Sequence, residues 1–138
     1  MKMYFLFFTF ILSAGISTAQ VQLFNAKTSY TPTSVGIVIY SNDVETVWNA
    51  LRLANYSRTE GDTVCIFLLG KGVEVEKLVE TNEDIKTQVD KLLDNGGEML
   101  GCGTCLKIRN TDDPKVCKFS SMGDLYDLVR KNKVVLTF

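Results

Sequence analysis

The feature that most limits the fold of this sequence is a series of short, uninterrupted apolar segments separated by segments with helical spacing. Residues 35–40 (VGIVIY) and 63–69 (TVCIFLL) are rich in β-branched and aromatic side chains and carry no charge. Strands that are covered on both faces of a parallel sheet have this composition, because neither face meets water. The two segments therefore predict buried strands of one parallel sheet.

Segments with helical periodicity follow these strands. Residues 41–43 offer capping oxygens, and Glu45 is placed to return a hydrogen bond to the Asn42 amide. Ser121 and Asp124 have the spacing of a second capping box. The apolar residues that recur at helical intervals are Val44, Val47, Trp48, Leu51 and Ala54 in the first helix, Ile85, Val89, Leu92 and Leu93 in a helix over 83–95, and Leu125, Leu128 and Val129 near the end.

Further strands are predicted at 98–102, 116–119 and 134–138, with a short helix over 104–110 and a short helix or irregular segment over 73–79. Alternating strands and helices predict a three-layer α/β/α sandwich with a mostly parallel sheet of about five strands. Sites in such sheets lie at the carboxyl ends of the strands. Three segments are expected there: 41–43, 70–72 and 101–105.

The N-terminal residues have the composition of a secretory signal peptide. Lys2 is followed by an apolar run over 4–12 and by the small residues Ser17 and Ala19. The run is shorter than the roughly 20 residues of a membrane span, so stable membrane insertion is not expected, although an uncleaved anchor is the alternative. We predict a signal peptide over 1–19, a leader over 20–34, one domain over 35–138, and a periplasmic or secreted protein.

Composition removes several classes of function. The formal net charge is −1 and no Lys/Arg run is present, which argues against a nucleic-acid partner. Because the chain has no histidine, hydrolase sites of the Ser-His-Asp or Cys-His type are excluded. Residues 70–72 (GKG) lack the spacing of a nucleotide-binding loop, so no cofactor is predicted. Lys71 could add charge to an anion cradle there, and a plain tight turn is the alternative.

Cys102 and Cys105 are the closely spaced cysteines of the chain. Cys102 is expected at a strand-to-helix junction, where backbone N–H groups favour a thiolate, and Cys105 could resolve a mixed disulfide. Gly101 and Gly103 would admit a substrate, with Thr104 completing the loop. A metal clip and a structural disulfide are the alternatives, although zinc usually takes four ligands.

The remaining thiols and charges have their own interpretations. Cys65 is expected to be a core residue, whereas Cys117 belongs either to the core or to the Cys102 loop. Lys107 and Arg109 could attract an anionic sulfur donor, or be solvated surface. The acidic pair Glu74/Glu76 is interpreted as solvated loop charge.

Five stretches together resemble the DsrE/DsrF-like family: GIVIY (36–40), VCIFLLGKGV (64–73), GCGTCLKIR (101–109), SMGDLYDLV (121–129) and KVVLTF (133–138). The resemblance covers about residues 35–138 and is sharpest around Cys102. It implies an α/β/α domain that assembles as a homo-oligomer, a trimer or a hexamer. It also implies sulfur transfer as a cysteine persulfide, with the carrier cysteine at Cys102 and a less general second cysteine at Cys105.

These observations give a leading hypothesis and two alternatives. The first is an exported sulfur carrier that accepts and donates sulfane sulfur on Cys102, with Cys105 as resolving thiol. Its partners would be a sulfur donor or acceptor protein or a small polysulfide. The alternatives are a thiol–disulfide oxidoreductase that uses the same pair, and a non-enzymatic binding or assembly module with a structural disulfide.

Overall fold

A computed structural model of the chain describes residues 30–138, so the predicted signal peptide and most of the leader lie outside the described residues. No helix within 30–138 is long and apolar enough to cross a membrane. In chain order the elements are β1 (Ser34–Ile39), α2 (Val44–Thr59), β2 (Thr63–Leu68), the 3₁₀ helix η1 (Gly70–Glu74), α3 (Val75–Thr81), α4 (Glu83–Asp94), β3 (Glu98–Cys102), α5 (Gly103–Ile108), β4 (Lys118–Ser120), α6 (Met122–Lys131) and β5 (Val134–Thr137).

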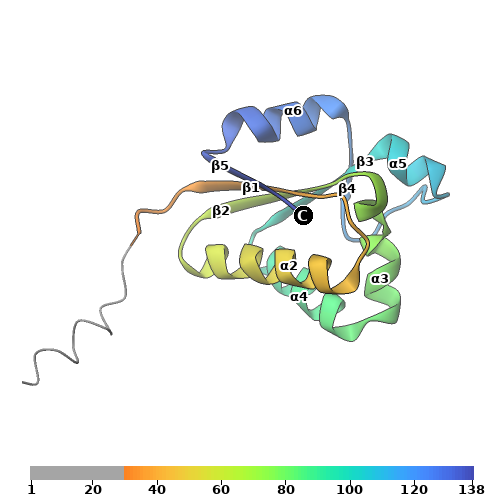
Figure 1. Cartoon of the computed structure of the whole chain (residues 1–138), viewed down its shortest axis with the longest axis horizontal. Helices are drawn as coiled ribbons and strands as arrows, with labels where there is room; N and C mark the ends of the chain where they lie inside the picture. Colours follow the sequence, from red (N-terminus) through yellow and green to blue (C-terminus); the bar gives the residue numbers. More distant parts are fainter. Residues whose placement is uncertain (1–29) are drawn as a thin grey trace, which may run out of the picture.

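The five strands form one sheet in the order β4-β3-β2-β1-β5. Every neighbouring pair is parallel. The helices α2, α3 and α4 lie on one side of the sheet and α6 lies on the other (Figure 1). The predicted α/β fold with a parallel, five-stranded sheet is confirmed.

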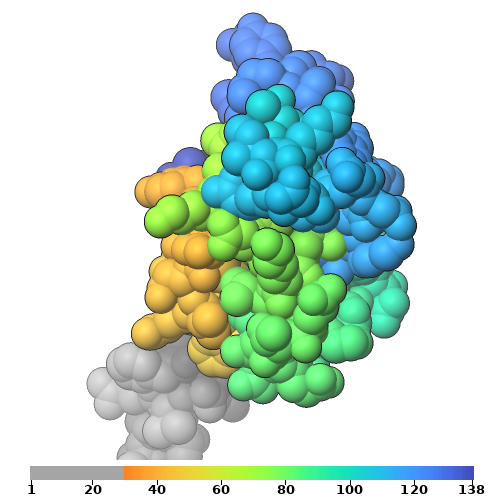
Figure 2. Space-filling model, turned by 90° about the vertical axis from the view of Figure 1, so that its right-hand side faces the viewer, coloured from red at the N-terminus to blue at the C-terminus, as the bar shows by residue number. Residues whose placement is uncertain are grey.

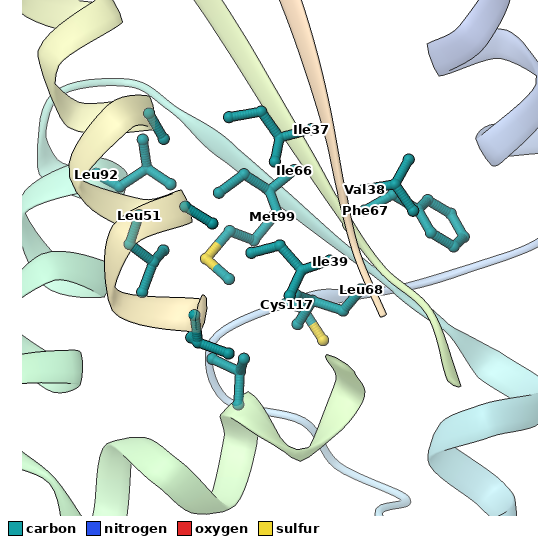
Figure 3. Close-up of a cluster of buried hydrophobic side chains, with 14 of the residues drawn as sticks. Ile37, Val38, Ile39, Leu51, Ile66, Phe67, Leu68, Leu92, Met99 and Cys117 are labelled. Carbon is teal, nitrogen blue, oxygen red and sulfur yellow. The ribbon is translucent and has the colours of Figure 1, made fainter. Parts of the chain in front are cut away.

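The core lies on both faces of the central strands, because successive side chains of a strand point to opposite faces. The side chains that face α2 and are at most 2% exposed include Ile37, Ile39, Ile66, Leu68 and Met99. Val38 and Phe67 point away from α2 and are buried as well (Figure 3). Burial on both faces explains why these strands are apolar without alternation.

The helical spacing of apolar residues predicted which face of each helix is buried, but not which residues at the margin of that face are exposed. Val44, Leu93 and Val129 are among the apolar residues that recur at helical intervals, but they are exposed. Trp48 is half-buried, with the Arg52 guanidinium 4.2 Å from the centre of its ring. A residue at the margin of a helical stripe is covered only if a neighbouring element reaches it, which periodicity alone does not determine.

The two predicted helix caps had different outcomes. The capping box of Ser121 and Asp124 is confirmed at the start of α6. The α2 cap is Asp43 rather than Asn42, and the Asp43 carboxylate accepts a hydrogen bond from the Thr46 amide at 2.9 Å. Asn42 is thereby left free for a contact with a distant part of the chain.

Candidate functional site

The three segments predicted to meet at the carboxyl ends of the strands lie next to one another. They follow β1, β2 and β3, which are adjacent in the sheet. Figure 2 shows this edge, where the segments after β1 (orange), β2 (green) and β3 (cyan) gather on one face of the molecule. Hydrogen bonds between side chains and backbone join them, as the following contacts show.

Cys102 is the last residue of β3 and precedes the first turn of α5. It pairs with Ser120 of β4, so it lies inside the sheet rather than on an open loop. Its exposed fraction is 5%. The predicted position at a strand-to-helix junction is therefore found, with the thiol enclosed.

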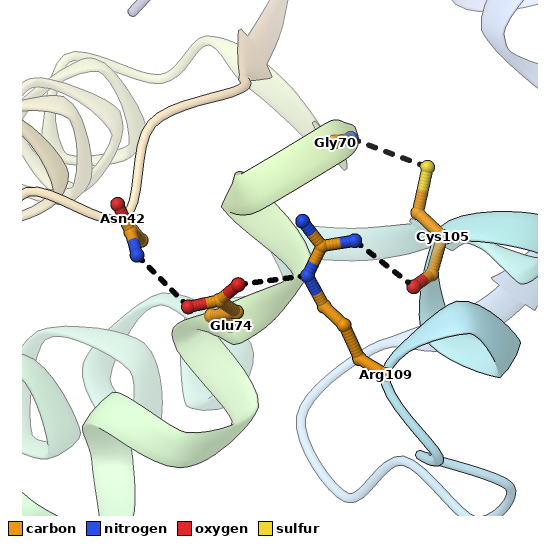
Figure 4. A network of polar contacts seen from close by, with 5 residues as sticks. All are labelled: Asn42, Gly70, Glu74, Cys105 and Arg109. Carbon is orange, nitrogen blue, oxygen red and sulfur yellow. Dashed lines mark hydrogen bonds and ion pairs between the residues drawn. The ribbon is translucent and has the colours of Figure 1, made fainter.

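Cys105 lies in the first turn of α5 and is partly exposed. Its Sγ accepts a hydrogen bond from the Gly70 amide at 3.3 Å, which ties α5 to η1 (Figure 4). Burial and then the neighbouring Cys102 side chain raise the pKa of Cys105, while the Gly70 amide and Arg109 act in the opposite direction. Cys102 directly precedes α5 and Cys105 lies in the first turn of that helix, so the two cysteines are neighbours.

An ion pair holds the three segments together beside Cys105. The Arg109 Nε donates to Glu74 Oε1 at 2.8 Å, and Asn42 Nδ2 donates to Glu74 Oε2 at 2.8 Å. The Arg109 Nη1 also donates to the Cys105 carbonyl oxygen at 3.3 Å, as Figure 4 shows. These bonds to Arg109 and then Asn42 lower the pKa of Glu74.

The interpretation of Glu74 and Arg109 as solvated charges is wrong. Their side chains are only 29% and 22% exposed and are bonded to each other. The two residues are 35 positions apart, so no local pattern reveals the pairing. The sequence contained only a weak indication that Arg109 belongs to the site. The residue lies one helical turn after Cys105, in the short helix predicted over 104–110.

Glu76 is a second carboxylate that the sequence analysis placed in solvent, and it is 8% exposed. It accepts backbone N–H bonds from Lys115 at 2.8 Å, Val116 at 3.1 Å and Cys117 at 3.1 Å. The pKa of Cys117 is raised, by burial first and by Glu76 second. Glu76 therefore fixes the backbone that leads into β4, the strand beside Cys102.

The glycines around Cys102 pack against the chain itself. A Cβ on Gly101 would lie 2.4 Å from the Cys117 Sγ, and one on Gly103 would lie 2.9 Å from the Phe119 ring. The space predicted to admit a substrate is therefore filled by these two side chains. Thr104 and Lys71 are exposed.

The other two cysteines are outside the pair. Cys117 is buried in the core, and its Sγ also packs against Gly101 next to Cys102, so both interpretations describe part of its position. Cys65 is partly exposed rather than buried, and it pairs with Glu98 at the opposite end of β3 from Cys102. Burial raises the pKa of Cys65 to about 11. All four cysteines lie in the described range and are free thiols, and within that range no three Cys, Asp or Glu side chains are grouped closely enough to hold a metal ion.

Comparison with known proteins assigns the chain to a family. The model of the DsrE/DsrF-like family matches residues 33–138. The chain belongs to the DsrE/DsrF-like family. This DsrE/DsrF-like chain is similar to an uncharacterized protein of Methanopyrus kandleri, with 28% identity over 88 residues, which cover 62% of this chain and 73% of that protein.

The fold has a counterpart among solved structures. A conserved protein of unknown function from Bacteroides thetaiotaomicron superposes with a TM-score of 0.65 and 20% sequence identity, covering 77% of this chain and 95% of the other. At that identity the likeness concerns the fold alone. The arrangement of thiols and charges in this DsrE/DsrF-like chain must therefore be interpreted from its own residues.

Proposed function

We propose that this protein is a sulfur carrier that holds sulfane sulfur as a persulfide on Cys102, with Cys105 as its partner thiol. The observation that carries the proposal is a pair of free, neighbouring thiols at the carboxyl edge of a DsrE/DsrF-like sheet, one enclosed and one partly exposed. A persulfide is easily reduced by other thiols. An enclosed position slows that loss, because thiol exchange depends on access to the sulfur.

The chemistry needs no cofactor. The thiolate of the carrier attacks the terminal sulfur of a persulfide or polysulfide, a new S–S bond forms, and the donor leaves as a thiolate or a shorter polysulfide. An acceptor thiolate takes the sulfur by the same displacement. If Cys105 instead attacks the inner sulfur of a Cys102 persulfide, hydrosulfide leaves and a Cys102–Cys105 disulfide forms. The partners are accordingly a small polysulfide or the thiol of a donor or acceptor protein.

The test is to incubate the reduced protein with polysulfide and measure its intact mass. We expect the mass of the wild type to rise by multiples of the mass of one sulfur atom. We expect the sulfur that persists on Cys102 in the wild type to be absent from Cys102→Ser. Cys65→Ser is the matched control, because Cys65 lies at the other end of the strands. A wild-type protein that gains no sulfur would refute the carrier function.

A thiol–disulfide oxidoreductase is the second candidate, favoured by the same proximity of two free thiols. The reduction potential of the Cys102/Cys105 couple separates a working oxidoreductase from a protein with a structural disulfide. A working couple falls in the range of known oxidoreductases, whereas a potential far below about −300 mV indicates a structural disulfide in a binding or assembly module.

We also propose export and self-association. Export rests on the signal-like segment over 1–19 and predicts a mature N-terminus at Gln20.

Self-association as a trimer or hexamer is supported by an exposed apolar stripe on α6. Its residues are Met122, Tyr126 and Val129, which lie about one helical turn apart and are all exposed. Tyr126→Lys should shift the mass measured by light scattering toward the monomer, and a wild type that is already monomeric would refute the assembly.

A further inference from the structure

We infer that Cys105 is the thiol that meets the sulfur donor first, and that the sulfur then moves inward to Cys102. The inference rests on the proposed function and adds an order to it. Sequence reasoning assigned the first attack to Cys102 because of its place at the strand end. The surroundings of the two thiols point to the reverse order.

Access is the first argument. Displacement at sulfur requires the attacking sulfur, the attacked sulfur and the leaving group to lie nearly in line, so the donor needs an open approach. Cys102 is 5% exposed. The chain itself covers the Cys102 side chain, whereas Cys105 is already partly exposed. A donor in solution therefore meets Cys105 without any part of the chain having to move.

The polar surroundings of Cys105 are the second argument. The Gly70 amide donates to the Cys105 Sγ at 3.3 Å. This N–H can donate to a thiolate before attack and to a persulfide anion after it, and it offsets part of the burial that raises the pKa of Cys105. The Arg109 guanidinium, bonded to the Cys105 carbonyl oxygen, lies alongside and is held in place by Glu74. Donors that fit this partly exposed thiol are small, such as a hydropolysulfide or a low-molecular-weight persulfide.

The transfer balances in two displacements. The Cys105 thiolate attacks the terminal sulfur of the donor, the donor S–S bond breaks, and the donor departs with the electron pair as its thiolate or shortened polysulfide. The Cys102 thiolate then attacks the terminal sulfur of the Cys105 persulfide, and Cys105 leaves as a thiolate. No oxidant or reductant is consumed, because sulfane sulfur is passed from one thiolate to the next.

The experiment is rapid mixing of the reduced protein with tetrasulfide, quenching by alkylation, and peptide mass spectrometry to locate the added sulfur. We expect it on Cys105 at the earliest times and on Cys102 later. Cys105→Ser and Cys105→Ala should slow the loading of Cys102 by more than about fivefold, because access limits exchange. Cys102→Ser should still load sulfur on Cys105, and Cys65→Ser should load both residues as the wild type does.

Two results would overturn the order. One is a pair of Cys105 variants that load Cys102 less than about fivefold more slowly than the wild type. The other is a Cys102→Ser protein on which Cys105 takes no sulfur. Both differ from failure of the proposed function itself, in which the wild type gains sulfur on neither residue.

Discussion

The bond network of Glu76 gives the sharpest test of how this site is built. The carboxylate is 8% exposed, and its two oxygens accept from three consecutive backbone amides, Lys115, Val116 and Cys117. Glu76→Gln keeps the size of the side chain but replaces one acceptor oxygen with an NH₂ donor. In the better of its two orientations the carbonyl oxygen serves Val116 and Cys117, and the NH₂ group faces the Lys115 amide.

The expected loss follows from the type of each bond. A hydrogen bond to a charged group contributes about 1.5–3 kcal/mol and one between neutral groups about 0.5–1.5 kcal/mol, so the two retained bonds lose about 1 kcal/mol each. The Lys115 amide loses its partner, but Lys115 is an exposed residue and this bond is only part-buried, so water replaces part of it. Relief of the desolvation of a buried charge offsets part of the total. We therefore expect Glu76→Gln to lower the free energy of unfolding by about 2 kcal/mol.

Glu76→Ala should be worse, because it also leaves the buried Cys117 amide without a partner and opens a cavity. We expect a loss of about 4 kcal/mol for this variant. Urea denaturation followed by circular dichroism measures both values. Hydrogen exchange at the amides of residues 115–117 should accelerate, which shows that the loss begins in this segment. Glu80→Gln, an exposed carboxylate on the same helix, is the matched control and should stay within about 0.5 kcal/mol of the wild type.

The reasoning would be refuted if Glu76→Gln and Glu76→Ala both unfolded within about 0.5 kcal/mol of Glu80→Gln. It would also fail if the amide of Cys117 kept its protection in Glu76→Ala. Either result would mean that the segment before β4 is held by its apolar contacts and not by the carboxylate.

Three further predictions concern the same edge of the sheet. Gly72→Ala should destabilise the protein by about 3 kcal/mol or more, since a Cβ there would lie 1.9 Å from the Ile39 carbonyl oxygen; a melting temperature equal to that of the wild type would contradict this. Because Arg109 lowers the pKa of Glu74, the pair stabilises the folded state above the unfolded pKa and loses this effect as pH falls. Glu74→Gln should thus be about 0.5–1 kcal/mol less stable than the wild type at neutral pH, with the difference vanishing near about pH 3, and a pH-independent difference would count against the ion pair. Since burial raises the pKa of Cys105, its alkylation rate should still be rising at about pH 9, and a plateau by about pH 8 would contradict that direction.

Many of the elements that form the site at the carboxyl edge of the sheet could be predicted from local sequence. A strand covered on both faces must be apolar at every position, so the strands were visible without any partner information. The capping box at Ser121 and Asp124 is local in the same way, because its bonds span three residues. Placing Cys102 at the end of β3 followed from the strand pattern alone. These features depend on neighbours in the chain, which a single sequence displays.

The partners of the charged residues could not be predicted in this way. Glu74 is bonded to a residue 35 positions later, and Glu76 to amides 39 to 41 positions later. A glutamate that caps a distant loop and one that faces solvent have the same local sequence. The interpretation of both as solvated charge was therefore the ordinary one for their type, and it was wrong here because the fold brings η1 and α3 against the segment after β3.

The sequence by itself determined the order of strands and helices along the chain, the burial of the two central strands, and the place of the two thiols at the carboxyl edge of the sheet, because these follow from periodicity and local hydrogen bonding. Only the tertiary structure decided how the thiols differ. It leaves Cys102 only 5% exposed and leaves Cys105 partly exposed against the Gly70 amide. Exposure is a property of what other segments cover, and those segments reach the site only when the sheet is assembled.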